Sequence, residues 1–219
     1  DGDLDAWIAN GQQLEPNTVW TNDGNGTFTN SGQTLGNSDS TSVALGDLDG
    51  DGDLDAFVSN EGKPSIVWTN NGNGIFTDSG QTLGNSTSLS VALGDLDGDG
   101  DLDAMVANFN APNTVWINDG NGTFSSGQTL GTDKSRSVAF GDINGDGHLD
   151  AMVANANGFD QITIWTNDGN GAFTSSGEFD TNLDCREVAL GDLDRDGDLD
   201  AMIAIGSFES NLVWTNDGT

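Results

Sequence analysis

Residues 42–59 read Ser-Val-Ala-Leu-Gly-Asp-Leu-Asp-Gly-Asp-Gly-Asp-Leu-Asp-Ala-Phe-Val-Ser. A short apolar segment stands at each end, and between the two segments aspartate alternates with glycine or leucine. The same pattern returns at residues 90–107, 137–154 and 187–204. Self-similarity at a fixed period of roughly 20–50 residues is typical of repeat architectures.

A recurring tryptophan defines the period of the repeat. Trp20, Trp68, Trp116, Trp165 and Trp214 follow one another at intervals of 48, 48, 49 and 49 residues, each in a string close to Val-Trp-Thr-Asn-Asp-Gly. The 219 residues therefore form a single domain of five repeats, of which the first and last are incomplete. The approximate bounds of the repeats are 1–41, 42–89, 90–136, 137–186 and 187–219.

Each period contains four short segments that read as strands, at 42–46, 54–59, 65–69 and 75–77 in the second repeat. β-branched and aromatic residues dominate these segments, and Gly and Asn separate them. Four strands in about 40–50 residues are typical of one propeller blade. We therefore predict an all-β protein, a β-propeller of four-stranded antiparallel blades. The small residues of the first segment suit a crowded strand lining a central channel.

The two ends of the chain do not complete a ring in this prediction. The chain begins at a second strand and stops after a third strand, so five second and third strands accompany four first and four fourth strands. Two explanations remain open. The chain is an excerpt of a longer propeller, or the remaining strands come from another chain.

The aspartate loop between the first and second strands has the pattern of a calcium site. Calcium takes six to eight oxygen ligands in flexible geometry. Carboxylates at loop positions 1, 3, 5 and 9 can converge on one ion, together with the backbone carbonyl at position 7. A glycine after position 5 allows the sharp turn around the metal.

Four loops supply this pattern, and a fifth is partial. The ligand positions are Asp47, Asp49, Asp51, Asp53 and Asp55 in the first loop, Asp95, Asp97, Asp99, Asp101 and Asp103 in the second, Asp142, Asn144, Asp146, His148 and Asp150 in the third, and Asp192, Asp194, Asp196, Asp198 and Asp200 in the fourth. Asn144 leaves the third loop one charge short, and His148 stands at position 7, where the carbonyl is the expected ligand. Asp1, Asp3 and Asp5 carry positions 5, 7 and 9 alone, so this site needs another strand to complete it.

Two other interpretations of the loops are weaker. An EF-hand shares the spacing but needs a bidentate Glu at position 12 and flanking helices. Position 12 is Val58, Val106, Val153 or Ile203, each inside an expected strand. A solvated acidic loop without a metal is the other reading. Four carboxylates within nine residues repel one another without a cation, which favours calcium.

The composition excludes several functions. The chain has 36 acidic and 5 basic residues and a formal charge of −31. Nucleic acid and anionic membranes need a basic surface, so neither is an expected partner. The chain has one histidine, His148, one cysteine, Cys185, and no tyrosine, which leaves little from which to assemble a nucleophile and its base. We therefore expect no enzymatic activity.

The run Val91-Ala92-Leu93-Gly94-Asp95-Leu96-Asp97-Gly98-Asp99-Gly100-Asp101-Leu102-Asp103-Ala104 resembles the FG-GAP/VCBS repeat. That repeat occurs in integrin α-subunit propellers, in several propeller lectins and in secreted bacterial proteins. The resemblance extends over essentially the whole chain. It implies a propeller, usually of seven blades, with calcium in the loop between the first and second strands.

The periodic tryptophans allow two interpretations. Aromatic faces bind sugars, but one large aromatic at a fixed strand position in every blade is what packing between blades requires. Packing is the favoured reading. Trp7 takes the position that Phe57, Met105, Met152 and Met202 take in the other repeats, and we expect it in the core as well.

The loops on the face opposite to the aspartate loops vary between repeats, and variable loops on a regular scaffold often carry recognition. Candidate ligand contacts are Gln12, Glu15, Lys63, Phe109, Phe159, Asp160 and Phe208. We expect a secreted or cell-surface protein, because millimolar free calcium exists outside cells. The expected role is a calcium-rigidified binding or adhesion module for glycan or protein. The alternatives are a structural subunit of a surface layer or filament that self-associates through its terminal blades, and a non-catalytic domain of a secreted enzyme.

Overall fold

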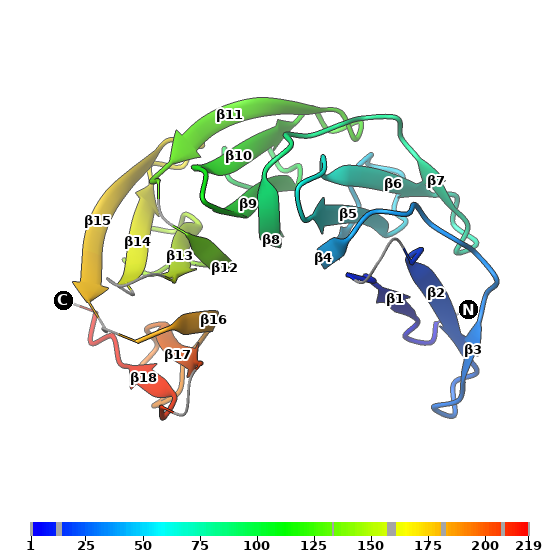
Figure 1. The fold of residues 1–219 in the computed structure, drawn as a ribbon. Coiled ribbons are helices and arrows are strands. Elements are labelled where there is room, and N and C mark those ends of the chain that lie inside the picture. Colours follow the sequence, from blue (N-terminus) through cyan, green and yellow to red (C-terminus); the bar gives the residue numbers. More distant parts are fainter. Residues whose placement is uncertain are drawn as a thin grey trace.

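The computed structural model describes residues 2–11, 15–132, 134–156, 161–180, 183–206 and 209–218. Five antiparallel sheets lie side by side in an arc, with the first strand of each complete sheet on the inside of the arc (Figure 1). Each sheet is a blade, and the blades are numbered 1 to 5 along the chain. No helix among the described residues is long and apolar enough to cross a membrane.

Blades 2, 3 and 4 have four strands each, and blades 1 and 5 have three. The strands of blade 1 are β1 (Ala6–Ile8), β2 (Thr18–Asn22) and β3 (Phe28–Asn30). Those of blade 2 are β4 (Ser40–Gly46), β5 (Asp55–Asn60), β6 (Ile66–Asn70) and β7 (Phe76–Asp78). Those of blade 3 are β8 (Thr87–Gly94), β9 (Asp103–Phe109), β10 (Asn113–Asn118) and β11 (Phe124–Leu130). Those of blade 4 are β12 (Ser135–Gly141), β13 (Asp150–Asn155), β14 (Gln161–Asn167) and β15 (Phe173–Asp180). Those of blade 5 are β16 (Cys185–Gly191), β17 (Asp200–Ile205) and β18 (Leu212–Trp214).

This architecture confirms the predicted four-stranded antiparallel repeat, and the strand bounds differ from the expected ones by one or two residues. Among the described residues, blade 1 has second, third and fourth strands, and blade 5 has first, second and third strands, as predicted. The EF-hand interpretation is wrong, because Val58, Val106, Val153 and Ile203 lie within strands of the sheets.

The hydrophobic core lies between neighbouring blades. One cluster between blades 3 and 4 joins Met105 and Val115 of blade 3 to Val153 and Phe173 of blade 4, all nearly or fully buried. Equivalent clusters lie between blades 1 and 2, 2 and 3, and 4 and 5. Each blade is therefore stabilised chiefly by the blades next to it, as in other repeat proteins.

A leucine and a glycine make a repeated contact between the inner strands. A Cβ added at Gly46, the last residue of β4, would lie 2.5 Å from Cδ1 of Leu102 in the next blade. The same holds for Gly94 against Leu149 and for Gly141 against Leu199. Glycine at the end of the first strand is thus required by the close approach of the next blade.

A glutamine in or just after the fourth strand of a blade makes two hydrogen bonds to the next blade, and we call this pair of bonds the glutamine clamp. The Gln81 side chain accepts a hydrogen bond from the backbone N–H of Phe124 at 2.8 Å and donates one to the carbonyl of Gly122 at 2.6 Å. Gln33 makes the same pair of bonds with Phe76 and Gly74. Repetition of these bonds fixes the position of each outer strand against its neighbour.

Four of the five periodic tryptophans confirm the packing interpretation, whereas Trp20 of blade 1 is half-buried on β2. Trp68, Trp116, Trp165 and Trp214 each pack in or against the core between two blades. Trp7 is 9% exposed and meets Phe76 edge to face, with ring centroids 6.4 Å apart. The side chain of Cys185 is buried at the start of β16.

The Gln81 clamp gives a test of packing between blades. Gln81→Ala should lower the free energy of unfolding by about 1–3 kcal/mol, because it leaves two partly buried backbone groups without a partner. Glu178 takes the equivalent position in blade 4 and is exposed, so Glu178→Ala is the matched control and should change the stability little. Urea unfolding measures both variants, and equal stability of the two would contradict the clamp.

Candidate metal centre

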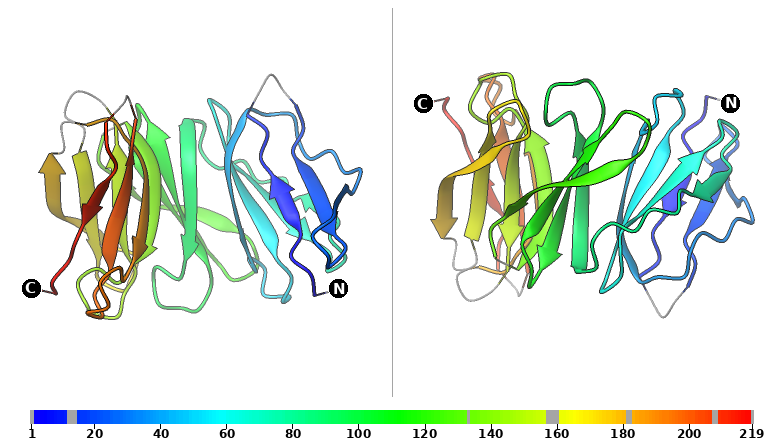
Figure 2. Two further views of the ribbon diagram at one scale, coloured as in Figure 1. Left: turned by 90° about the horizontal axis from the view of Figure 1, so that it is seen from below. Right: turned by 90° about the horizontal axis from the view of Figure 1, so that it is seen from above.

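The aspartate loops lie on one face of the arc, at the ends of the first strands. Figure 2 shows the arc edge-on, with the connections between strands gathered on two opposite faces. The first loop starts after Gly46 and ends at Asp55, the first residue of β5. Gly50 and Gly52 have φ angles of 77° and 93°, in the left-handed region that favours glycine. In the fourth loop Arg195 takes the position of Gly50, with a φ of 70°.

Backbone N–H groups within the loop hold three of the carboxylates in place. Asp47 accepts hydrogen bonds from the N–H groups of Gly50 and Gly52, at 2.8 and 3.0 Å. Asp49 accepts one from Asp51, and Asp51 accepts one from Asp53. Only one oxygen of Asp49 and one of Asp51 takes part, so the other oxygen of each carboxylate has no such bond. The second loop repeats this arrangement.

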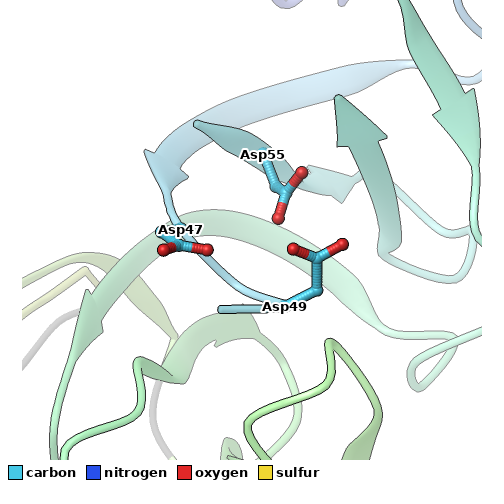
Figure 3. A group of neighbouring side chains, drawn as sticks. All are labelled: Asp47, Asp49 and Asp55. Atoms are coloured by element: carbon cyan, nitrogen blue, oxygen red, sulfur yellow. The ribbon is translucent and has the colours of Figure 1, made fainter. Parts of the chain in front are cut away.

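Carboxylates of the loop converge on a common point. In the first loop one oxygen from each of Asp47, Asp49 and Asp55 lies within 4.8 Å of the other two (Figure 3). Asp95, Asp97 and Asp99 meet the same criterion in the second loop, and Asp192, Asp194 and Asp200 do so in the fourth. Ligand oxygens at about 2.3–2.6 Å from one calcium ion stand at most about 5 Å apart. The spacing and the oxygen chemistry therefore fit a calcium ion.

The carboxylate at position 9 is the most buried member of the loop. Asp103 has no exposed surface. One of its oxygens accepts the N–H of Leu96 at 3.0 Å, and the other accepts the N–H of Asn118, at the end of β10, at 2.8 Å. Asp55, Asp150 and Asp200 make the equivalent pairs of bonds. This residue therefore joins the loop to the second and third strands of its blade.

Burial changes the acidity of these groups. The pKa of Asp103 is raised to about 6, chiefly by loss of solvation. The two backbone hydrogen bonds oppose this rise, and the nearby charges of Asp97 and Asp99 contribute to it. Burial also raises the pKa of Asp55 and Asp150. The pKa of Asp200 is lowered instead, because its backbone hydrogen bonds outweigh burial in the terminal blade.

The asparagine at the end of the third strand connects each loop to the next blade. The amide of Asn118 donates to the carbonyl of Leu48, in the loop of blade 2, at 2.8 Å. Asn167 donates to the carbonyl of Leu96, and Asn216 donates to that of Ile143. Each of these three loops therefore lies between its own blade and the following one. Our sequence interpretation missed this role, although the recurrence of Trp-Thr-Asn or Trp-Ile-Asn was a signal for it.

Position 7 has its side chain outside the cluster of carboxylates. A Cβ added at Gly72 would meet Oδ2 of Asp53, which places the Asp53 side chain against the turn between the third and fourth strands. Asp101 lies in the same way against Gly120, Asp198 against Gly218, and His148 against Gly169. This placement agrees with a ligand role for the backbone carbonyl rather than the side chain, which stays a prediction.

The third loop and the N-terminal partial loop differ from the other loops. In the third loop the amide of Asn144 donates to Asp146 at 2.9 Å and its oxygen accepts the Asp146 N–H at 2.8 Å. In blade 1, Asp5 accepts the N–H of Asn22 and Asp3 lies against Gly24, so positions 9 and 7 have their usual places. Asp1 lies outside the described residues.

The candidate ligand contacts do not form one site among the described residues. Glu15 and Lys63 are exposed, each between the second and third strands of its blade. Phe109 is half-buried at the end of β9, with Lys134 Nζ and Arg136 Cζ each 5.3 Å from its ring centroid. Gln12, Phe159, Asp160 and Phe208 lie outside the described residues.

The repeat matches a known family. The FG-GAP-like repeat is found four times, over residues 1–58, 47–106, 95–153 and 142–203. The chain belongs to the FG-GAP-like repeat family. Each match runs from one aspartate loop, or from the partial loop, into the strand that follows the next aspartate loop. The sequence matches no curated protein.

Solved structures share the fold. A 6-phosphogluconolactonase candidate from Bacteroides uniformis superimposes with a TM-score of 0.66 at 13% identity, over 97% of this FG-GAP-like chain and 71% of the other. BBS1N, solved in complex with ARL6DN, gives a TM-score of 0.59 at 11% identity, over 92% and 60%. Identities this low show a common fold alone, and neither activity nor partner carries over.

The buried aspartates predict how the metal-free protein responds to pH. The folded state keeps a proton on Asp103 up to pH about 6, whereas the unfolded chain releases it near its ordinary value of 3.8. Between these values the folded state binds more protons, so its free energy of unfolding falls as pH rises. In excess EDTA the unfolding midpoint should be higher near pH 5 than near pH 7.5.

Asp103→Asn removes the titrating group and is the matched variant for this measurement. It should reduce the difference between the two midpoints in EDTA. A midpoint that rises with pH in EDTA, or an unchanged difference in the variant, would contradict the assignment.

Proposed function

We propose that this FG-GAP-like protein is an extracellular calcium-binding β-propeller that acts as a binding or adhesion module for glycan or protein. The observation that carries the proposal is the convergence of carboxylates in the loops, with ligand oxygens within 4.8 Å of one another. Asp95, Asp97 and Asp99 are the most direct example. Millimolar free calcium outside cells would fill sites of moderate affinity, which supports a secreted or cell-surface location.

The position of the loops supports a structural role for the ion. The loop of blade 3 touches blade 4 through the bonds from Asn167 and Gly171 to the carbonyl of Leu96, each at 2.8 Å. A cation that holds Asp95 and Asp97 would stabilise the segment that presents this carbonyl. It would also offset the repulsion between the carboxylates in a protein of net charge −31. Calcium would therefore stabilise both the blade and the contact between blades.

Other divalent ions fit this donor set less well. Magnesium requires near-ideal octahedral geometry and keeps several waters, whereas calcium accepts six to eight oxygens in flexible arrangements. The loop offers carboxylates at four positions and a carbonyl at a fifth, with no thiolate. Oxygen ligands of this number favour calcium over the softer transition metals as well.

The third loop provides an internal test of the calcium proposal. Asn144 stands where the other loops have an aspartate, so the third loop carries one negative charge fewer. Asn144→Asp should tighten binding to the weakest site several-fold, because calcium affinity rises with the number of ligand charges. Isothermal titration with calcium measures this, and Thr77→Asp on the outer strand β7 is a matched control for the added charge. The proposal would be contradicted if neither the parent chain nor the Asn144→Asp variant bound calcium.

The face opposite to the aspartate loops is the proposed recognition face. It carries the connections that differ between blades, and Glu15, Lys63 and Phe109 lie on it. Four of the five basic residues are also on this side, among them Lys134 and Arg136, while the aspartate loops concentrate negative charge on the other face. A binding role is favoured over catalysis, because Cys185 is buried in the core and His148 lies on the opposite face.

A glycan and extracellular-protein array in calcium-containing buffer tests the recognition face. The protein should bind a restricted set of ligands, and Lys63→Glu or Phe109→Ala should weaken binding at least several-fold. Thr77→Asp, away from this face, should bind as the parent does. A protein with saturated calcium sites that binds nothing on the array would count against the recognition role without affecting the calcium proposal.

A further inference from the structure

Three of the five basic residues gather at one place in this acidic chain. They are Lys134, Arg136 and Arg186. Lys134 stands directly before β12, Arg136 is the second residue of β12, and Arg186 is the second residue of β16. β12 and β16 are the first strands of blades 4 and 5, and each ends at an aspartate loop (Figure 1). The three cations therefore lie at the other end of these strands, on the proposed recognition face.

Phe109 brings two of these cations together. Its ring is half-buried at the end of β9 in blade 3, and Lys134 Nζ and Arg136 Cζ of blade 4 each lie 5.3 Å from the ring centroid. The aromatic face attracts each cation, but two like charges beside one ring repel each other. An anion bound next to them would offset this repulsion. We call Phe109, Lys134 and Arg136 the cationic cluster.

One carboxylate, that of Asp184, compensates part of the positive charge. One of its oxygens accepts a hydrogen bond from Nε of Arg186 at 2.8 Å and pairs with Nη2 of the same side chain. Its other oxygen lies 3.6 Å from Nε of Arg136, which is too far for a hydrogen bond. Lys134 forms no ion pair among the described residues. Three cations and one carboxylate therefore leave two positive charges in excess.

Arg136 has donors that the protein does not use. Its Nε is buried and has no hydrogen-bond partner within the described part of the chain, and a quarter of the side chain is exposed. A guanidinium group binds a carboxylate through two parallel N–H bonds, whereas a lysine supplies a single point of charge. The cationic cluster thus offers both kinds of donor beside one aromatic ring.

The surroundings of the cationic cluster favour an anion in spite of the net charge of −31. β12 runs over seven residues from the cluster to the aspartate loop of its blade, which is about 20 Å at about 3.3 Å per residue. At physiological ionic strength, charges more than about 8 Å apart are largely screened from each other. Blades 3 and 4 each have a blade on either side, so these surroundings do not depend on the ends of the sequence.

We propose that the cationic cluster binds the carboxylate of an acidic sugar. The carboxylate would accept hydrogen bonds from Arg136 and Lys134, and the apolar face of the sugar ring would lie against Phe109. A sugar is favoured because the site combines an aromatic surface with a few polar groups in a small area, as ligand sites commonly do. This inference rests on the proposed recognition role and gives it a ligand class, a glycan that contains uronic acid or another carboxylated sugar.

Titration with three small molecules, followed by NMR in saturating calcium at constant ionic strength, tests the proposal. D-glucuronate has the sugar ring and the carboxylate, D-glucose has the ring alone, and acetate has the carboxylate alone. Glucuronate should shift the amide signals of Phe109, Lys134 and Arg136 at millimolar concentration. Acetate should bind at least several-fold more weakly, and glucose should leave these signals unchanged.

Two substitutions assign the binding to the cationic cluster. Lys134→Gln removes one charge, and Arg136→Lys keeps the charge but loses the paired donors of the guanidinium. Each should weaken glucuronate binding at least several-fold. Thr77→Asp, exposed on β7 in blade 2, changes the net charge by the same amount as Lys134→Gln and should bind glucuronate as the parent does. Thermal unfolding by circular dichroism verifies that each variant is folded.

Three outcomes would overturn the proposal. The first is a parent chain whose cluster signals do not move with glucuronate. The second is equal binding of acetate and glucuronate, because the site would then accept an acidic peptide as readily as a sugar. The third is unchanged glucuronate binding in both cluster variants. All samples contain saturating calcium, so none of these outcomes bears on calcium binding, and a neutral glycan or a protein bound on the array would leave the recognition role standing.

Discussion

In blades 2 to 5 an aspartate carboxylate without exposed surface lies where the loop, the second strand and the third strand meet. For Asp103 the two oxygens accept N–H groups from Leu96 and Asn118, and the acidic side chains of Asp97 and Asp99 stand close by. Burial of one charge beside others is costly unless a cation compensates it. This burial of charge supports the proposal that a cation stabilises the loops of blades 2, 3 and 5, where the carboxylates converge.

The coupling extends from blade to blade. Asn118 is held by Asp103 within its own blade and donates its amide to Leu48 in the blade before. Two other contacts join blades 2 and 3. The glutamine clamp of Gln81 lies at the outer strands, and the contact between Gly46 and Leu102 lies at the inner side of the arc. Each blade therefore depends on its neighbours for the burial of its apolar faces.

Much of this structure could be predicted from the sequence. The period of the tryptophans predicted the blades, and the segments rich in Val, Ala and Trp predicted the strands to within one or two residues. The aspartate spacing predicted the loops in which carboxylates converge. These features are local, because a strand, a turn or a nine-residue loop is determined by residues near in sequence. The FG-GAP-like family match agrees with them.

The contacts between blades could not be predicted in the same way. The bond from Asn118 to Leu48 joins residues 70 positions apart, and the clamp from Gln81 to Phe124 spans 43 positions. Their recurrence at each period was visible, but recurrence alone does not show which backbone group a side chain will meet. The left-handed backbone of Arg195 was not predicted for a different reason. Arginine replaces glycine at this position in one loop alone, and a single substitution gives no pattern.

Amide hydrogen exchange with and without calcium tests the central claim most directly, because it reports on single bonds. If the ions hold the loops that join the blades, removing calcium should lower the protection of the Leu96 and Asn118 amides, which bond to Asp103, and of the Gly171 amide, which crosses to the loop of blade 3. The amides in the middle of β9 should change less. Equal protection of all these amides in the two conditions would contradict the account, because the loops would then hold the blades together without a metal.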